Sequence, residues 1–115
     1  DTGSIYNMAA MANPAAEIHI CEGEFDSMIL EQCGWPAVAL PGATSWQTFW
    51  TKFFEGYDHI YIWSDPDKAG DQMAQTLQTA LSQATRVPLT LGDVTDTYLQ
   101  AGKTGLTQAL NTVLQ

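Results

Sequence analysis

Short apolar runs alternate with segments of helical periodicity along most of this chain, and that alternation restricts the folds open to it. The apolar runs are "EIHIC" (17–21), "PAVAL" (36–40), "HIYIW" (59–63) and "RVPLTL" (86–91). A stretch with apolar residues at helical spacing follows each run. This order predicts an α/β domain with a roughly four-stranded, mostly parallel sheet and helices on both faces. Pro88 indicates that the fourth run is an edge strand.

The helical stretches also predict which side chains face the core. Each stretch has one apolar face, and these faces comprise Phe25, Met28, Ile29 and Cys33; Trp46, Phe49, Trp50 and Phe53; Ala69, Met73, Leu77, Ala80, Leu81 and Ala84; and Leu106, Leu110 and Val113. Gly34 would end the first helix, and Ser45 would cap the second. We expect Trp50, and Trp63 in the third strand, to lie in the core and not to stack on bases.

Length and composition favour one domain. Of the 115 residues, we expect 17–115 to form the domain and 1–16 to be a linker or tail. The chain begins with Asp and not Met, so we expect a piece of a longer protein. No apolar run approaches the ~20 residues of a membrane span, and no signal-peptide pattern is present, which favours a cytoplasmic setting. Cys21 and Cys33 form no metal or redox motif, and His19 and His59 are expected to be structural.

The charge of the chain limits what it can bind unaided. The sequence has 13 acidic and 4 basic residues, which gives a net charge of −9 at neutral pH. Such a surface is repelled by the phosphates of nucleic acids. If the chain acts on nucleic acid, cations or another domain must supply the positive charge.

Acidic residues gather directly after three of the four apolar runs. In chain order they are Glu22, Glu24 and Asp26, then Asp65 and Asp67, then Asp93 and Asp96. The carboxyl ends of parallel strands share one edge of a sheet, so these acids would meet there, with Glu24 facing solvent. Helix capping explains one acid per helix, and Asp67 alone is explained as well by a cap as by a ligand role. Several carboxylates together repel one another, and a divalent cation removes that conflict.

Three motifs resemble the Toprim family. They are Glu22-Gly23-x-x-Asp26, Asp65-x-Asp67-x-Ala69-Gly70, and Asp93 with Asp96, and the resemblance covers roughly residues 17–101. Within that family the pattern is most similar to bacterial and phage-type primases. Two positions depart from the pattern, since Gly92 stands where Lys is usual and Thr95 where Asn is usual.

The resemblance implies a catalytic domain for RNA primer synthesis in DNA replication. The implied cofactor is Mg²⁺ or Mn²⁺, with two ions. The implied partners are nucleoside triphosphates, a single-stranded DNA template bound through other primase domains, and a helicase. The implied setting is a bacterial or phage-infected cell, with no membrane. The residues assigned in this way are Glu22, Asp26, Asp65 and Asp67 as catalytic; Glu22, Asp65, Asp67, Asp93 and Asp96 as metal ligands; and Lys68 and Gly70 as nucleotide-binding. Asp96 could instead cap a helix.

Three other readings remain open from the sequence. A Toprim nuclease would use the same acids to break phosphodiesters. A receiver-like signalling module also carries acids at strand ends, although the Glu22-Gly23-x-x-Asp26 start and the Asp65/Asp67 pair argue against it. A non-catalytic metal-binding interaction domain is the third alternative.

Overall fold

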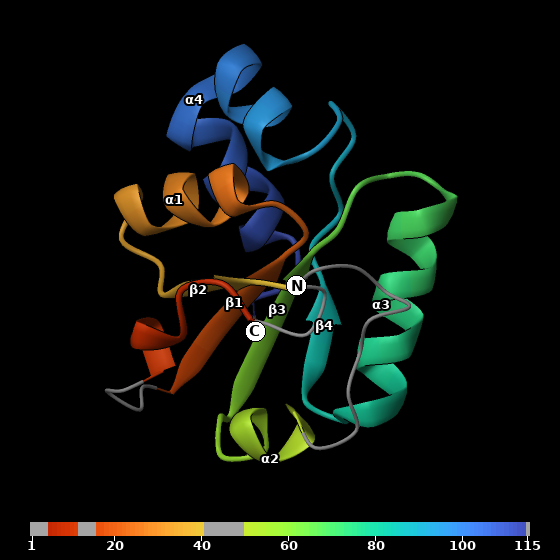
Figure 1. Ribbon diagram of the computed structural model, residues 1–115. Coiled ribbons are helices and arrows are strands. Elements are labelled where there is room, and N and C mark those ends of the chain that lie inside the picture. Colours follow the sequence, from red (N-terminus) through yellow and green to blue (C-terminus); the bar gives the residue numbers. More distant parts are fainter. Residues whose placement is uncertain (1–4, 12–15, 41–49, 115) are drawn as a thin grey trace.

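A four-stranded parallel sheet forms the centre of the protein (Figure 1). The computed structural model describes residues 5–11, 16–40 and 50–114. Its strands are β1 Glu17–Cys21, β2 Ala37–Ala39, β3 His59–Trp63 and β4 Ala84–Arg86. They lie in the order β2-β1-β3-β4, and every neighbouring pair is parallel. The predicted α/β class and parallel sheet are therefore confirmed.

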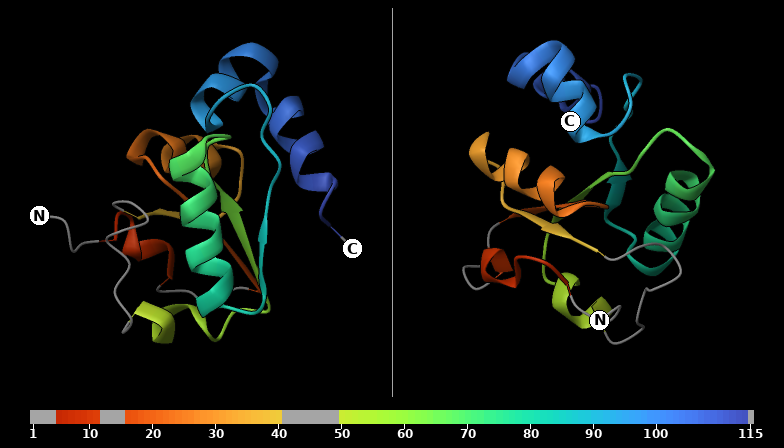
Figure 2. Two further views of the ribbon diagram at one scale, coloured as in Figure 1. Left: turned by 90° about the vertical axis from the view of Figure 1, so that its right-hand side faces the viewer. Right: turned by 45° about the horizontal axis from the view of Figure 1, so that its top comes forward.

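Helices cover both faces of this sheet, as predicted. Helices α1 (Glu24–Gln32) and α4 (Val94–Asn111) lie on one face, and α2 (Thr51–Phe54) and α3 (Lys68–Ala80) on the other (Figures 1 and 2). Gly102 interrupts α4 with a φ of 64°, which an L side chain rarely adopts. None of the described helices is long and apolar enough to span a membrane.

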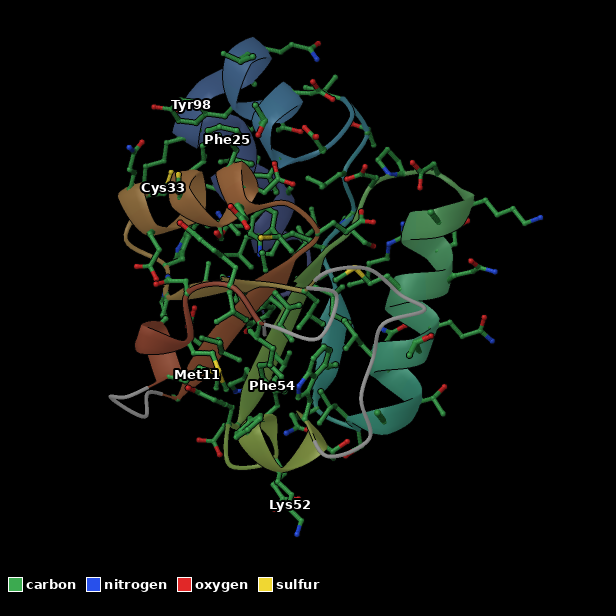
Figure 3. The ribbon with its side chains drawn as sticks, in the orientation of Figure 1. Met11, Phe25, Cys33, Lys52, Phe54 and Tyr98 are labelled. Carbon is green, nitrogen blue, oxygen red and sulfur yellow. The ribbon has the colours of Figure 1, made fainter. Side chains whose placement is uncertain are left out.

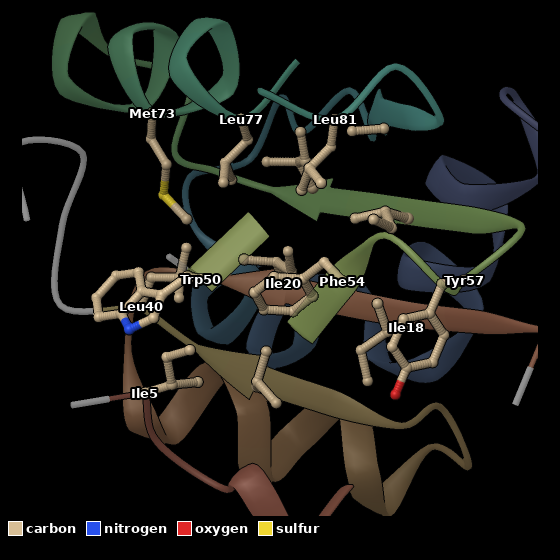
Figure 4. Close-up of a cluster of buried hydrophobic side chains, with 14 of the residues drawn as sticks. Ile5, Ile18, Ile20, Leu40, Trp50, Phe54, Tyr57, Met73, Leu77 and Leu81 are labelled. Carbon is tan, nitrogen blue, oxygen red and sulfur yellow. The ribbon is translucent and has the colours of Figure 1, made fainter. Parts of the chain in front are cut away.

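Successive strand residues face opposite layers of the core, because side chains alternate along a strand. Ile18 and Ile20 point into the layer beneath α2 and α3, where Trp50, Phe54 and Met73 are buried (Figure 4). The other layer contains a second set of buried residues from the strands, α1, α4 and the segment after β4, among them Cys21, Leu30, Trp63, Val87, Val94, Leu106 and Leu110. The predicted burial of Trp50 and Trp63 is confirmed, whereas Ser45, Trp46 and Phe49 lie outside the described residues.

His19 is fully buried in this second layer. Its Nδ1 accepts a hydrogen bond of 2.8 Å from the Trp63 indole N–H, and its Nε2 lies 2.5 Å from Glu17 Oε2. Indole nitrogen can only donate, so the ring proton is on Nε2 and is donated to Glu17. Burial lowers the pKa of His19. The histidine is therefore structural, as expected.

The buried face of α1 agrees with the predicted one only in part, since Cys33 is buried and Ile29 packs against the core as predicted. Asp26, Ser27 and Leu30 are its buried residues, whereas Phe25 is 76% exposed and Met28 is also exposed (Figure 3). The helix is rotated because the Asp26 carboxylate accepts hydrogen bonds inside the fold, and that satisfies a polar group in a buried position. Similarly, Phe54 and not Phe53 is buried on α2.

The fourth strand is shorter and earlier than predicted. β4 ends at Arg86, and the last ladder bond runs from the Val87 N–H to the Ile62 carbonyl at 2.8 Å. Pro88 has no N–H to continue the ladder, so the predicted strand at 86–91 is wrong in its bounds. Ala84, predicted on a helix face, lies in β4. Pro88 did indicate correctly that this strand lies at an edge.

Part of the segment expected to be a tail packs against the sheet. Ile5 is buried, and Tyr6 pairs antiparallel with Ala39 of β2. A short 3-10 helix, η1 (Met8–Met11), follows. Asn7 Nδ2 donates to the Ala37 carbonyl and to Glu31 Oε2, at 2.9 Å each. These contacts hold residues 5–11 beside β2, and the division of the chain at residue 17 stays a prediction.

Candidate metal centre at the carboxyl ends of the strands

Three carboxylates from distant parts of the chain meet at one edge of the sheet. Asp26 lies in the first turn of α1, Asp65 follows β3, and Asp93 precedes α4. One oxygen of each lies within 4.8 Å of the others. They meet because β1 and β3 are adjacent and parallel, so the segments that leave them emerge at the same edge. Of the seven acids predicted at this edge, Asp26, Asp65 and Asp93 therefore lie together.

Among these acids, Asp65 has the most strongly shifted pKa. Its backbone N–H donates a 2.7 Å hydrogen bond to Glu22 Oε2. Within the described part of the chain, its buried Oδ1 has no hydrogen-bond partner. Burial, a hydrogen bond between the Asp65 and Glu22 side chains, and the charges of Glu22, Asp93 and Asp67 raise the pKa of Asp65 to about 7. An unpaired buried carboxylate oxygen among other acids is a site that favours a cation.

Thr95 supports Asp26 from the other side of the cluster. Asp26 Oδ1 accepts hydrogen bonds from the Thr95 N–H at 3.1 Å and from its hydroxyl at 2.7 Å. Burial raises the pKa of Asp26, and the Thr95 hydroxyl opposes that shift. Position 95 had been read only as a departure from the primase pattern. Its role as a donor to Asp26 depends on a contact between α1 and α4 that the sequence does not reveal.

Asp67 is placed differently from its neighbour Asp65. Its Oδ1 accepts a 2.7 Å hydrogen bond from the Gly70 N–H and so caps α3. The group of acids within 4.8 Å of one another contains Asp26, Asp65 and Asp93 but not Asp67. Its charge nevertheless contributes to the raised pKa of Asp65. Asp67 therefore has the helix-capping role that the sequence left as one alternative, and the assignment of Asp67 as a metal ligand stays a prediction.

Asp93 and Asp96 form a reciprocal capping box at the start of α4. Asp93 Oδ1 accepts from the Asp96 N–H at 2.7 Å, and Asp96 Oδ2 accepts from the Asp93 N–H at 3.1 Å. Asp93 therefore both caps the helix and belongs to the acid cluster, whereas Asp96 has the capping role that had been left open.

The local backbone geometry explains why position 92 is a glycine. Gly92 has a φ of 106°, and an added Cβ would lie 2.3 Å from Asp96 Oδ2. A side chain there would collide with the capping box. The residue that stands where primases usually have Lys therefore fits the local geometry of this chain.

Gly70 allows α3 to approach the turn that carries Asp65. A Cβ on Gly70 would lie 1.8 Å from the Asp65 carbonyl oxygen. Lys68, two residues earlier, is exposed at the start of α3. The nucleotide-binding roles assigned to these two residues stay predictions.

Arg86 also contacts this part of the chain and was not singled out from the sequence. Its guanidinium donates to the Asp65 carbonyl at 2.8 Å and to Asp71 Oδ1 at 2.6 Å. Arg86 is the last residue of β4, at the same sheet edge as the acids. The rule that drew attention to the acids, position at a strand end, would have found Arg86 had the end of β4 been placed correctly.

The chemistry of these side chains fits a hard divalent cation. The cluster offers carboxylate oxygens, which are the ligands that Mg²⁺ and Mn²⁺ prefer. Bringing three acids together costs free energy that a bound cation would offset. The buried, unpaired Asp65 Oδ1 is the atom with most to gain from such a ligand.

Fold, acids and sequence define a Toprim domain. The family model described as Toprim-like matches residues 19–97, and the chain belongs to that family. A protein of Mycobacterium phage D29 named Gene 57 protein is 32% identical over 111 residues, which cover 96% of this chain and 73% of that protein.

Two solved phage structures have the same fold. The primase fragment of the bacteriophage T7 primase-helicase matches with a TM-score of 0.81 at 19% identity, over 96% of this chain and 49% of that one. The second structure contains T7 lagging-strand DNA polymerase with primase domains bound to an RNA/DNA hybrid and dTTP; the match has a TM-score of 0.69 at 22% identity, over 81% and 52% of the two chains. The present chain thus spans about half the length of these solved chains.

Proposed function

We propose that this chain is the catalytic Toprim domain of a DNA primase and that it takes part in metal-dependent nucleotidyl transfer during RNA primer synthesis. The observation that carries the proposal is the cluster of Asp26, Asp65 and Asp93, with one oxygen of each within 4.8 Å of the others. Membership of the Toprim-like family and the fold of a phage primase fragment support it.

In this proposal Asp26, Asp65 and Asp93 hold one Mg²⁺ or Mn²⁺ ion. Glu22 and Asp67, whose charges act on Asp65, would be ligands for a second ion, and Asp96, which caps α4, would be a further ligand. When bound, the ions would activate the primer 3′-hydroxyl for attack on the α-phosphate of a nucleoside triphosphate and stabilise charge on the leaving oxygens.

Glu22 is suited to receive the proton of that hydroxyl. Its Oε2 accepts a hydrogen bond from the Asp65 N–H at 2.7 Å, which orients the carboxylate beside the acid cluster. Lys68, exposed at the start of α3, would contact a phosphate of the nucleotide. The net charge of −9 requires that other domains of the primase bind the DNA template, and a helicase is the expected partner.

Calorimetric titration with Mn²⁺ tests the metal centre. We expect the wild type to bind, and Asp65→Asn to bind much more weakly because a cluster ligand loses its charge. Asp58→Asn is the matched control, since Asp58 is exposed and lies just before β3, at the opposite end of that strand from Asp65. Equal binding by the wild type and Asp65→Asn would overturn the assignment.

Primer synthesis in the full-length gene product tests the reaction. We expect ribonucleotide incorporation on a single-stranded DNA template in the presence of Mg²⁺, and its loss in Asp65→Asn but not in Asp58→Asn. Cleavage of DNA without primer synthesis would show instead that the acids serve a Toprim nuclease.

A further inference from the structure

Arg86 contacts the backbone of a cluster residue and not its carboxylate. One nitrogen of its guanidinium donates to the Asp65 carbonyl at 2.8 Å. Another donates to Asp71 Oδ1 on α3 at 2.6 Å. The guanidinium therefore links three elements: β4, on which it lies; the turn after β3; and the first turns of α3. The Arg86 side chain is 28% exposed and that of Asp71 is 66% exposed, so the bond to the Asp65 carbonyl is better shielded from water than the bond to Asp71.

The peptide groups of Asp65 are held from several sides. Its N–H donates to Glu22 at 2.7 Å, and its carbonyl accepts from the Asp67 N–H at 2.9 Å as well as from Arg86. The Cα of Gly70 packs against the same carbonyl so closely that a Cβ would lie 1.8 Å away. An Asp side chain has few rotatable bonds, so the position of the Asp65 backbone determines where its carboxylate points. These contacts therefore determine where the unpaired Asp65 Oδ1 lies relative to Asp26 and Asp93.

We propose that Arg86 is a positioning residue of the metal centre. Its guanidinium donates hydrogen bonds to the Asp65 carbonyl and to the Asp71 carboxylate. These two bonds fix the turn at Asp65 and so keep the Asp65 carboxylate in position for a shared cation. The inference rests on the proposed function for the identity of the ligand. The effect of Arg86 on the position of Asp65 rests only on the hydrogen bonds to the Asp65 backbone.

Charge and geometry predict opposite effects for this residue. A guanidinium beside a cation site repels the cation, so removing its charge alone would strengthen metal binding. Removing a group that orients a ligand would weaken binding, typically about 10-fold to 100-fold for partners of metal ligands. The sign of the change therefore separates a positioning role from a purely electrostatic one.

The first experiment measures Mn²⁺ affinity by calorimetry in the wild type and in three variants of this chain. Arg86→Met and the control Lys52→Met remove one positive charge each, and Lys52 lies exposed on α2, at the opposite end of β3 from Asp65 (Figure 3). We expect Arg86→Met to bind at least about 10-fold more weakly than Lys52→Met. Arg86→Lys keeps the charge and loses the planar fork, and we expect it also to bind more weakly than the wild type. Unchanged or tighter binding by Arg86→Met would overturn the proposal.

The second experiment needs no metal. Amide hydrogen exchange, followed by NMR in the metal-free chain, reports on the Asp67 N–H, whose acceptor is the carbonyl that Arg86 holds. We expect faster exchange at Asp67 in Arg86→Met and Arg86→Lys, and wild-type exchange in Lys52→Met. Unchanged exchange at Asp67 in both Arg86 variants overturns the positioning role, whereas a wild type that binds no Mn²⁺ overturns the proposed function.

Discussion

The raised pKa of a single residue, Asp65, predicts how the metal-free chain responds to pH. Its ordinary value is 3.8 and its value in the fold is about 7, so the folded state binds this proton more tightly than the unfolded state. The resulting stabilisation is complete below pH 3.8 and is lost as the pH rises through about 7. In the presence of a chelator, we therefore expect Asp65 to make the free energy of unfolding fall across this range.

Urea unfolding at a series of pH values checks this expectation. Asp65→Asn should remove the fall that Asp65 causes, and the control Asp58→Asn should retain it. Added Mg²⁺ should flatten the trend in the wild type, because the cation binds the ionised carboxylates. The same slope in the wild type and in Asp65→Asn would contradict the role given to this carboxyl group.

Glu22 is the second residue whose substitution has a defined outcome. Its Oε2 accepts from the Asp65 N–H, and the carbonyl of Gln can accept the same bond. Glu22→Gln removes a negative charge from the cluster, so we expect it to stabilise the metal-free fold and to weaken Mn²⁺ binding. Thermal unfolding with a chelator and calorimetry measure the two effects. Glu24→Gln is the control, since Glu24 is exposed. A loss of about 1 kcal/mol or more in Glu22→Gln would show that the charged hydrogen bond from the Asp65 N–H outweighs the repulsion among the acids.

At the scale of the elements, the approach of α3 to the end of β3 depends on Gly70. In Gly70→Ala the new Cβ would lie 1.8 Å from the Asp65 carbonyl oxygen, so the helix or the turn must move. We expect a loss of about 1–3 kcal/mol in the free energy of unfolding, despite the better helix propensity of Ala, together with weaker Mn²⁺ binding. Denaturant unfolding measures the first effect. Gly56→Ala is the control, because a Cβ at Gly56 meets nothing within 4 Å. Similar stability in the two variants would contradict this account of α3 packing.

The elements also show how far the sequence could predict the fold. β1 and β3 have the predicted bounds, because each is a compact apolar run ended by acids. Phe25 and Met28 were wrongly placed on the buried face of α1 because Asp26 is buried there through its bonds to Thr95, a residue 69 positions later. Arg86 was missed because the predicted fourth strand began at this residue, whereas β4 ends there and brings it to Asp65 and Asp71. Periodicity predicts local structure well, but a polar group paired across the fold leaves no periodic signal.

On the scale of the whole molecule, the net charge of −9 predicts weak binding of nucleic acid by this chain alone. The acid cluster concentrates negative charge at one edge of the sheet and adds to this repulsion. We expect a gel-shift assay with single-stranded DNA and Mg²⁺ at low salt to show weak or no binding. A single-stranded-DNA-binding protein of similar size is the positive control for the assay conditions. Tight binding by this chain would contradict the need for other, basic domains.

The contact between Asp26 and Thr95 also bears on the order of folding. It closes a loop of 69 positions, whereas β1 and β2 pair much closer together along the chain. Contacts of such long sequence separation form late, because their closure entropy must be offset by structure already in place. We therefore expect the acid cluster to be assembled after most of the sheet has formed. A cation that binds this cluster would then leave the folding rate nearly unchanged and would act mainly by slowing unfolding.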